Sequence, residues 1–66
     1  MERTNNYRKF RKQAELRPEV AASEIGVSLQ TLYKWENGET APSAEKLRKM
    51  AVIYNCSSDE LICLSN

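Results

Sequence analysis

Four polar side chains in the middle of the chain recur at helical spacing and could act together by hydrogen bonding. They stand at positions i, i+3, i+4 and i+7, so a helix places them on one face. The four are Gln30, Tyr33, Lys34 and Asn37. Amide and hydroxyl groups that donate and accept hydrogen bonds, beside one ammonium charge, suit binding rather than catalysis. An amphipathic surface helix without a binding role shows the same pattern, so the spacing leaves both interpretations open.

The residue types that usually carry catalysis or bind metals are absent or wrongly spaced. The chain has no histidine, and its two cysteines, Cys56 and Cys63, stand seven apart without companion ligands. There is no glycine-rich phosphate loop and no paired-carboxylate motif. We therefore expect that the protein is not an enzyme and that it binds no metal ion, cofactor or small-molecule ligand. The cysteines are interpreted as small buried hydrophobic residues with free thiols.

Length and composition predict one small folded domain over residues 1–66. The chain is 41% hydrophobic and 29% charged, which gives it enough apolar side chains for a compact core. A fold of this size buries only about 60% of its unfolded surface, so its stability is modest. No run approaches the roughly 20 apolar residues of a membrane span, and the first residues lack the apolar core of a signal peptide. We expect a cytoplasmic protein without membrane contact.

Positive charge gathers at the start of the chain, although the formal net charge is only +1. Residues 1–17 contain six basic and two acidic side chains, a local charge of +4, whereas residues 18–42 have a local charge of −3. The six basic residues are Arg3, Arg8, Lys9, Arg11, Lys12 and Arg17. Such a cluster can attract phosphates, but basic residues on a short helix are more often its solvated face. Charge alone does not decide between these interpretations.

Helical periodicity predicts a first helix over roughly residues 5–15 and a second over about 18–25. The inward stripe of the first helix consists of Tyr7, Phe10, Arg11 and Ala14. Arg11 is unusual there, because a buried arginine needs an anionic partner. Pro18 fits the first turn of the second helix, and Gly26 fits the position just past its end. The expected inward residues of the second helix are Ala21, Ala22 and Ile25.

Cap residues predict a third helix over about 29–36, a fourth over about 44–54 and a fifth that starts near Ser57. Ser28 is the expected N-cap of the third helix, and Asn37-Gly38 tolerates the left-handed backbone that ends a helix. The fourth helix should start at the cap Ser43 and pack with Leu47, Met50, Ala51 and Tyr54. A capping box in the fifth, formed by Ser57 and Glu60, precedes Leu61, Ile62 and Leu64.

The third helix has two different sides. Leu32 and Trp35 are three residues apart and share a face with Val27, while the four polar residues occupy another face. We expect Trp35 to pack in the core rather than stack on a base, and we expect Tyr33 to be exposed. A short helix held behind a tight glycine turn after another short helix is typical of a helix presented at the surface.

These residues resemble the phage-repressor/Cro-type (XRE) helix-turn-helix family over about residues 7–62. The match rests on "LRPEVAASEIGVSLQTLYKWENGETAPSAEKLRKMA", followed by a final "SSDELI". The resemblance implies an all-α, five-helix, lambda-repressor-like domain in which the second and third helices form the helix-turn-helix. It also implies a sequence-specific regulator of transcription, acting as a repressor, that binds double-stranded DNA by placing the third helix in the major groove.

The resemblance further implies a role for each matching position. Base contacts fall to Ser28, Leu29, Gln30, Thr31, Tyr33 and Lys34, and phosphate contacts to Arg17, Asn37, Gly38 and Thr40. Glutamine can pair with adenine, lysine can reach guanine, and leucine can pack on a thymine methyl group. Phosphate contacts near the end of the third helix would use backbone N–H groups and small polar side chains. The resemblance also pairs Arg11 with Glu36, which supplies the anionic partner that the inward arginine needs.

Two positions depart from the family pattern. Arg17-Pro18 stands where the family opens its second helix with Ser or Thr followed by Gln, so this helix lacks a side-chain cap and a polar phosphate contact. The Arg17 charge could replace that phosphate contact. Ala21 stands where the family favours a larger aliphatic residue, so Val20 or Leu16 is expected to fill the space.

Two functions from different classes remain open. The first is the DNA-binding regulator, expected to act as a homodimer on a palindromic site because one domain of this size covers only a half-site. The second is a protein-interaction module on the same fold, such as an antitoxin-like or adaptor protein, which the low net charge favours. Leu61, Ile62 and Leu64 either close the core or form a self-complementary dimer interface.

Overall fold

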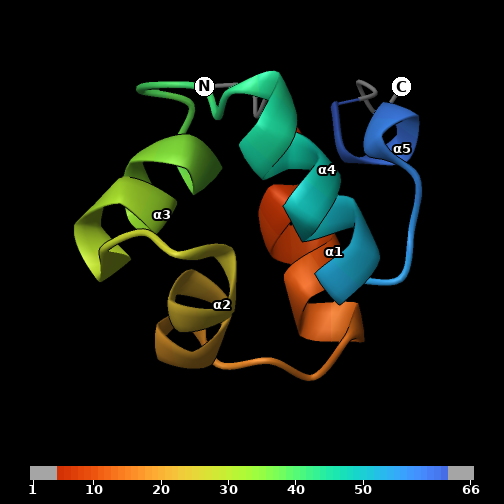
Figure 1. Cartoon of the computed structure of the whole chain (residues 1–66), viewed down its shortest axis with the longest axis horizontal. Coiled ribbons are helices and arrows are strands. Elements are labelled where there is room, and N and C mark those ends of the chain that lie inside the picture. Colours follow the sequence, from red (N-terminus) through yellow and green to blue (C-terminus); the bar gives the residue numbers. More distant parts are fainter. Residues whose placement is uncertain (1–4, 63–66) are drawn as a thin grey trace.

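A computed structural model describes residues 5–62 of the chain and shows five helices joined by short loops within that range (Figure 1). The helices are α1 (Tyr7–Gln13), α2 (Pro18–Ile25), α3 (Leu29–Glu36), α4 (Ala44–Ile53) and α5 (Ser58–Ile62). The predicted all-α, lambda-repressor-like fold is confirmed, and the described residues contain no strand. Arg3, Cys63 and Leu64, which entered the predictions, lie outside the described residues.

The five helices pack as two groups around α4. In Figure 1, α2 and α3 lie together on one side, α5 lies on the other, and α4 runs between them. Helix α4 packs on both α2 and α5, while α1 packs on α3 and α5. The start and end of the described chain are also joined, since the Asn6 backbone N–H donates to the Leu61 carbonyl at 2.8 Å.

Helix α1 is shorter than the predicted range of 5–15 at both ends. At its start, the Asn5 side chain accepts a hydrogen bond from the Tyr7 N–H at 3.1 Å and donates to the Trp35 carbonyl at 3.0 Å. Asn5 therefore stays outside the helix and joins its first turn to α3. At the other end, Glu15 has a positive φ of 60°, which a helix does not accommodate.

The turn between α2 and α3 follows the predicted pattern. Pro18 is in the first turn of α2, and Gly26 ends that helix in the left-handed conformation at φ 92°. A side chain at Gly26 would be strained in this conformation, which explains the glycine. The ammonium of Lys46, on α4, lies beside this turn. A cation near the C-terminal end of α2 interacts favourably with the negative end of the helix dipole. Helix α2 has no basic residue of its own in its last turn.

The remaining helix ends also agree with the predicted caps, with one difference. Ser28 and Ser43 cap α3 and α4, accepting from the backbone N–H of Thr31 and Lys46 at 3.2 Å each. The capping box that opens α5 is present, with both reciprocal bonds between Ser57 and Glu60. Of the pair that ends α3, Gly38 adopts a positive φ of 82°, whereas Asn37 keeps a helical backbone.

The core of the described residues lies where the inward faces of the helices meet. Its fully or nearly buried apolar members are Tyr7, Ala21, Ala22, Ile25, Leu32, Trp35, Met50, Tyr54 and Leu61. All the predicted inward residues of α2 are among them, and so is Trp35. Leu16 packs against this core, but Val20 is exposed and does not fill space beside Ala21. Leu61 closes the core while its neighbour Ile62 is exposed.

Candidate nucleic-acid interface

The polar face of α3 is open to solvent, and its opposite face is buried. Gln30, Lys34 and Asn37 are exposed, and Tyr33 keeps 40% of its surface accessible. Behind them, Leu32 and Trp35 are buried in the core. The buried residues fix the rotation of the helix about its axis, so the same polar side chains always face outward.

The first turn of α3 carries a paired hydroxyl group. Ser28 Oγ accepts from the Thr31 N–H and lies 2.9 Å from Thr31 Oγ1, within hydrogen-bonding distance. Whichever hydroxyl donates to the other, one hydroxyl hydrogen stays available to an outside acceptor. Leu29 and Thr31 are partly buried, so they present less surface than Gln30.

The end of α3 differs from the arrangement that the resemblance implied. The backbone N–H groups there are already used, since Gly38 donates to the Trp35 carbonyl at 3.1 Å and Glu39 donates to the Lys34 carbonyl at 2.9 Å. Thr40 also donates to the Lys34 carbonyl, at 3.4 Å. Tight closure of the helix after Gly38 turns these donors inward. Side chains are therefore the groups at this end that remain open to an outside partner.

Arg17 stands apart from the α3 residues, at the start of α2. It occupies the N-cap position with an extended backbone, and its side chain makes no capping bond. It is exposed, followed by Pro18 and then by the acidic Glu19 in the first turn. The arginine charge and the first turn of α2 thus face solvent with a carboxylate nearby.

A buried ion pair holds α3 against α1. Arg11 Nε donates to Glu36 Oε2 at 2.7 Å, and Arg11 Nη2 donates to Glu36 Oε1 at 3.3 Å. Glu36 has no exposed surface and Arg11 has 6%. The hydrogen bond to Glu36 raises the pKa of Arg11 above its ordinary value, against the opposite effect of burial. The inward arginine therefore has the anionic partner that its position on the α1 stripe required.

Arg8 also belongs to this arrangement, and the sequence patterns did not predict it. Arg8 Nε donates to Glu36 Oε1 at 3.1 Å, and Arg8 Nη2 donates to Asn37 Oδ1 at 3.1 Å. One carboxylate thus binds two guanidinium groups from α1. Arg8 stands three residues before Arg11, and this spacing on one helix face is the signal that could have identified it.

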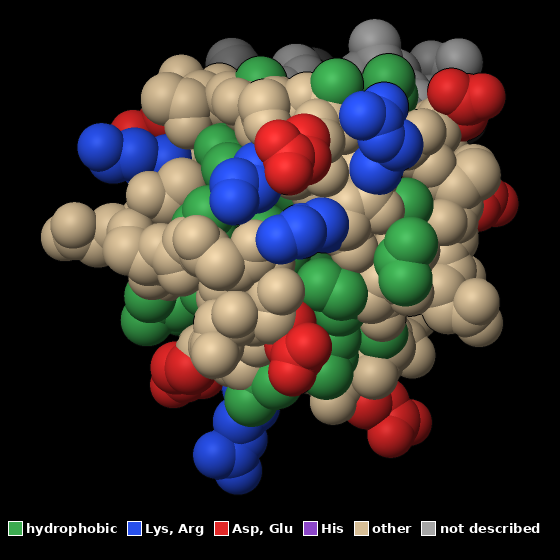
Figure 2. Space-filling model, in the orientation of Figure 1, with side chains coloured by type: hydrophobic (Ala, Val, Ile, Leu, Met, Phe, Trp, Pro, Cys, Tyr) green, Lys and Arg blue, Asp and Glu red, His purple; other side chains and the backbone are tan. Residues whose placement is uncertain are grey.

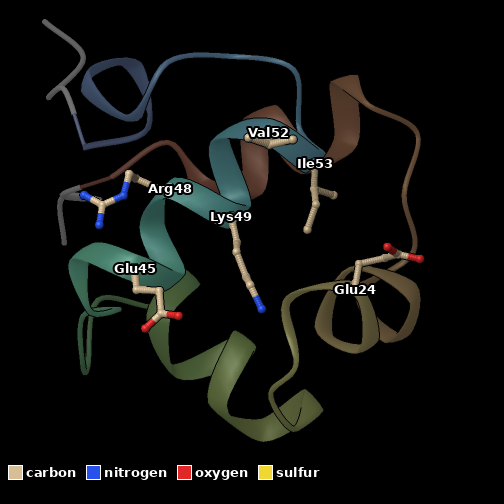
Figure 3. A pocket seen from close by; sticks show the side chains of 6 residues that line it. All are labelled: Glu24, Glu45, Arg48, Lys49, Val52 and Ile53. Carbon is tan, nitrogen blue, oxygen red and sulfur yellow. The ribbon is translucent and has the colours of Figure 1, made fainter.

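A concave surface lies elsewhere among the described residues, between α2 and α4 (Figure 3). It is an open groove of about 420 Å³ lined by Glu24, Glu45, Arg48, Lys49, Val52 and Ile53. None of these is a predicted interface residue, and the Lys49 side chain extends into the groove (Figure 3). Acidic and basic side chains are interspersed on this face of the molecule (Figure 2), unlike a surface of one sign.

Residues 5–62 contain neither a cluster that could bind a metal ion nor a membrane-spanning helix. No cluster of three or more potential metal ligands occurs there. No helix in the same range is long and apolar enough to cross a membrane.

The exposed polar helix behind a glycine turn, with a hydrophobic core on its other side, defines a helix-turn-helix domain. The chain matches the helix-turn-helix family over residues 8–61 and belongs to that family, in its phage-repressor type. Members of this class are DNA-binding regulators. No curated protein sequence matches the chain significantly.

Solved structures of similar proteins agree with this assignment. The chain is 31% identical to the P22 c2 repressor bound to a synthetic operator, covering 88% of each chain with a TM-score of 0.81. It is also 31% identical to the DNA-binding domain of the P22 c2 repressor in solution, covering 82% of this chain and 71% of that one at a TM-score of 0.77. A transcriptional regulator from Listeria innocua is 30% identical over 92% of this chain and 57% of that one, with a TM-score of 0.78.

Proposed function

We propose that this protein is a sequence-specific regulator of transcription that binds double-stranded DNA and acts as a repressor. The observation that carries this proposal is the outward face of α3, which is polar, accessible and fixed from behind by Leu32 and Trp35. A major groove about 12 Å wide accepts one α-helix presented in this way. The similarity to the P22 c2 repressor, whose structure was solved in complex with a synthetic operator, supports DNA binding by this chain.

The residues of α3 divide into base-reading and supporting roles in this proposal. Gln30 makes a bidentate pair with adenine, and Lys34 reaches guanine O6 or N7, because both side chains are exposed on the outward face. Leu29 packs on a thymine methyl group with the part of its surface that remains open. The spare hydroxyl hydrogen of the Ser28–Thr31 pair donates to a base edge, and Tyr33 contacts a neighbouring base.

Phosphate contacts flank α3 and set its position in the groove without reading sequence. At the end of α3 they come from the side chains of Asn37 and Thr40, because the backbone donors there are occupied. Gly38 contributes by allowing the backbone to pass close to the duplex. Arg17 supplies a charge for a phosphate contact at the start of α2, in place of the polar contact that the family has there; the helix itself has no side-chain cap.

We propose that residues 1–66 act as one domain and that two copies bind a palindromic site in the cytoplasm. One copy covers a half-site, so the two centres are separated by about one helical turn of DNA. The polar groups on the described surface serve binding, and the protein is not an enzyme. The exposed Ile62 is available to a second copy, whereas Leu61 is used in the core.

Selection of bound duplexes from a random pool tests this function directly. The expected result is an enriched site with two-fold symmetry, bound more weakly as salt rises because phosphate contacts release counterions. Binding that shows no preference over random DNA at moderate salt would contradict the proposal. Sedimentation of the protein with and without the selected duplex measures whether two copies bind.

A protein-interaction module is the second candidate function. It is favoured by the net charge of +1 and by Val52, a large apolar residue on α4 with 81% of its surface exposed. Capture of a defined protein partner by a chain that has no affinity for any duplex would favour this candidate over the first.

A further inference from the structure

Arg8 joins α1 to the end of α3. It contacts Glu36, the last residue of that helix, and Asn37, the residue that follows it. Its guanidinium donates through Nε to Glu36 and through Nη2 to Asn37, at 3.1 Å in each case. The Arg8 side chain is 34% exposed while that of Glu36 is fully buried, so Arg8 spans from the interior to the surface. The planar fork of a guanidinium can satisfy two acceptors in this fixed geometry, whereas a lysine ammonium acts as a point charge.

The bond to Arg8 determines which end of the Asn37 amide faces outward. An asparagine side chain has one acceptor oxygen and one NH₂ donor group, and the oxygen is occupied by Arg8. The NH₂ group therefore stays available on an exposed residue. Phosphate oxygens only accept hydrogen bonds, so an outward NH₂ group is the end of the amide that a DNA backbone can use.

The same contact places positive charge near the C-terminal end of α3, where a phosphate would approach. The C-terminal end of a helix carries a partial negative charge, which repels phosphate. Arg8 and Arg11 share one carboxylate, Glu36, so this group of three side chains has a net charge of +1 directly beneath the last turn of α3. That excess charge offsets the repulsion where a phosphate would approach Asn37.

We infer that Arg8 is a positioning residue of the DNA interface, which holds the Asn37 side chain with its NH₂ group free to donate to a phosphate oxygen. This inference rests on the proposed function. Arg8 acts through Asn37, so its effect on DNA binding depends on the presence of the amide. The role is distinct from that of Arg11, whose guanidinium donates to Glu36 and to the Leu16 carbonyl and lies deeper in the fold.

Affinity measurements on four variants test the inference, using a duplex selected from the random pool. The variants are Arg8→Ala, Arg8→Lys, Asn37→Ala and the double substitution of Arg8 and Asn37 by Ala. Lys9→Ala is the matched control, because Lys9 loses the same charge from the same helix while its ammonium lies over the Phe10 ring, 5.6 Å from the centroid. All measurements are made at a temperature where circular dichroism shows each variant fully folded.

We expect Arg8→Ala and Asn37→Ala each to weaken binding by about tenfold, as loss of one hydrogen bond to a charged acceptor does. The double variant should bind within about twofold of Asn37→Ala alone, because the lost Arg8 charge then acts only at a distance, as the Lys9 charge does. Arg8→Lys should resemble Arg8→Ala, and Lys9→Ala should stay within about twofold of the unmodified chain. Additive losses in the double variant, or full affinity in Arg8→Lys, would overturn the inference.

A second measurement does not depend on DNA. The side-chain NH₂ resonances of Asn37 in the free protein should shift in Arg8→Ala and stay in place in Lys9→Ala. Unchanged resonances in Arg8→Ala would overturn the positioning role even if the duplex selection succeeds. Failure of the selection together with shifted resonances would instead count against the DNA-binding function and leave the Arg8–Asn37 contact established.

Discussion

Arg11 on α1 and Glu36 at the end of α3 are joined by two hydrogen bonds, although 25 residues separate them in the chain. The same guanidinium donates from Nη1 to the Leu16 carbonyl at 3.0 Å, in the loop before α2. One buried side chain therefore connects α1, the loop to the helix-turn-helix and the end of α3. The position of the outward face of α3 depends on this connection as well as on apolar packing.

Replacement of Glu36 by Ala should destabilise the fold strongly. It leaves the buried Arg11 without its carboxylate, and loss of one partner of a buried pair costs about 3–5 kcal/mol. A chain of this length has about 3–10 kcal/mol of total stability, so the loss is a large part of it. Urea unfolding at 25 °C measures the change. The control is the double variant Arg11→Met with Glu36→Leu, which should be more stable than Glu36→Ala because no buried charge is left unpaired, the Arg8 side chain being 34% exposed.

A double-mutant cycle on the same pair gives the coupling free energy. We expect a value well above the roughly 0.2–1 kcal/mol of exposed ion pairs, since both side chains are buried. A coupling near zero would mean that the two charges act independently of each other.

Ser28→Ala and Ser43→Ala should lower stability equally but differ in DNA binding. Each removes an N-cap bond of 3.2 Å, from α3 and from α4 respectively, and such a loss costs about 1 kcal/mol. Thermal unfolding followed by circular dichroism compares the two. Only Ser28 is among the proposed base-contacting residues, so only Ser28→Ala should weaken binding to the selected duplex. Equal effects on binding would show that cap stability alone accounts for the loss.

Tyr54 makes stability fall at alkaline pH. Its hydroxyl is buried without a hydrogen-bond partner among residues 5–62. Burial, with a smaller effect of the Glu36 carboxylate, raises the pKa of Tyr54 from 10 to about 12. The folded state therefore keeps the proton that the unfolded state loses, so the free energy of unfolding falls between pH 10 and about 12, by about 2–3 kcal/mol.

Tyr54→Phe should remove that part of the alkaline loss and leave the protein at least as stable near pH 7. The substitution deletes a buried hydroxyl that has no partner, and it leaves the ring in place. Urea unfolding at several pH values from 7 to 12 measures both effects. A clear loss of stability at neutral pH would show that the hydroxyl has a favourable interaction.

Gln30→Ala and Lys34→Ala should change different properties of DNA binding. Loss of the Gln30 amide should cost about 1–3 kcal/mol at one base pair and relax the preference there, because a bidentate pair discriminates between bases. Loss of the Lys34 charge should weaken binding and also reduce its salt dependence. Binding to duplexes with single base changes at two salt concentrations separates the two effects. An unchanged base preference in Gln30→Ala would show that Gln30 does not contact a base.

The sequence was most informative where a structural rule acts within one helix or one turn. Prolines, glycines and serines at caps predicted the bounds of α2 and α3, because the groups that satisfy a helix end are close in sequence. Periodicity likewise predicted that Leu32 and Trp35 are buried while Gln30 and Lys34 are exposed. Val20 was wrongly assigned as a possible filler of the core, because position on a short helix does not reveal how the neighbouring helices pack.

Only the tertiary structure decided which distant groups meet. The Arg11–Glu36 pair was expected from resemblance. Spacing places Arg8 on the same face of α1 as Arg11, but it does not show that Arg8 binds the same carboxylate and also Asn37. The occupied backbone donors at Gly38 and Thr40 depend on how the chain closes after α3. Periodicity assigns a face to each side chain because it depends on one helix. A hydrogen bond across elements also requires the distance and angle between two helices, which are set by the packing of the whole core.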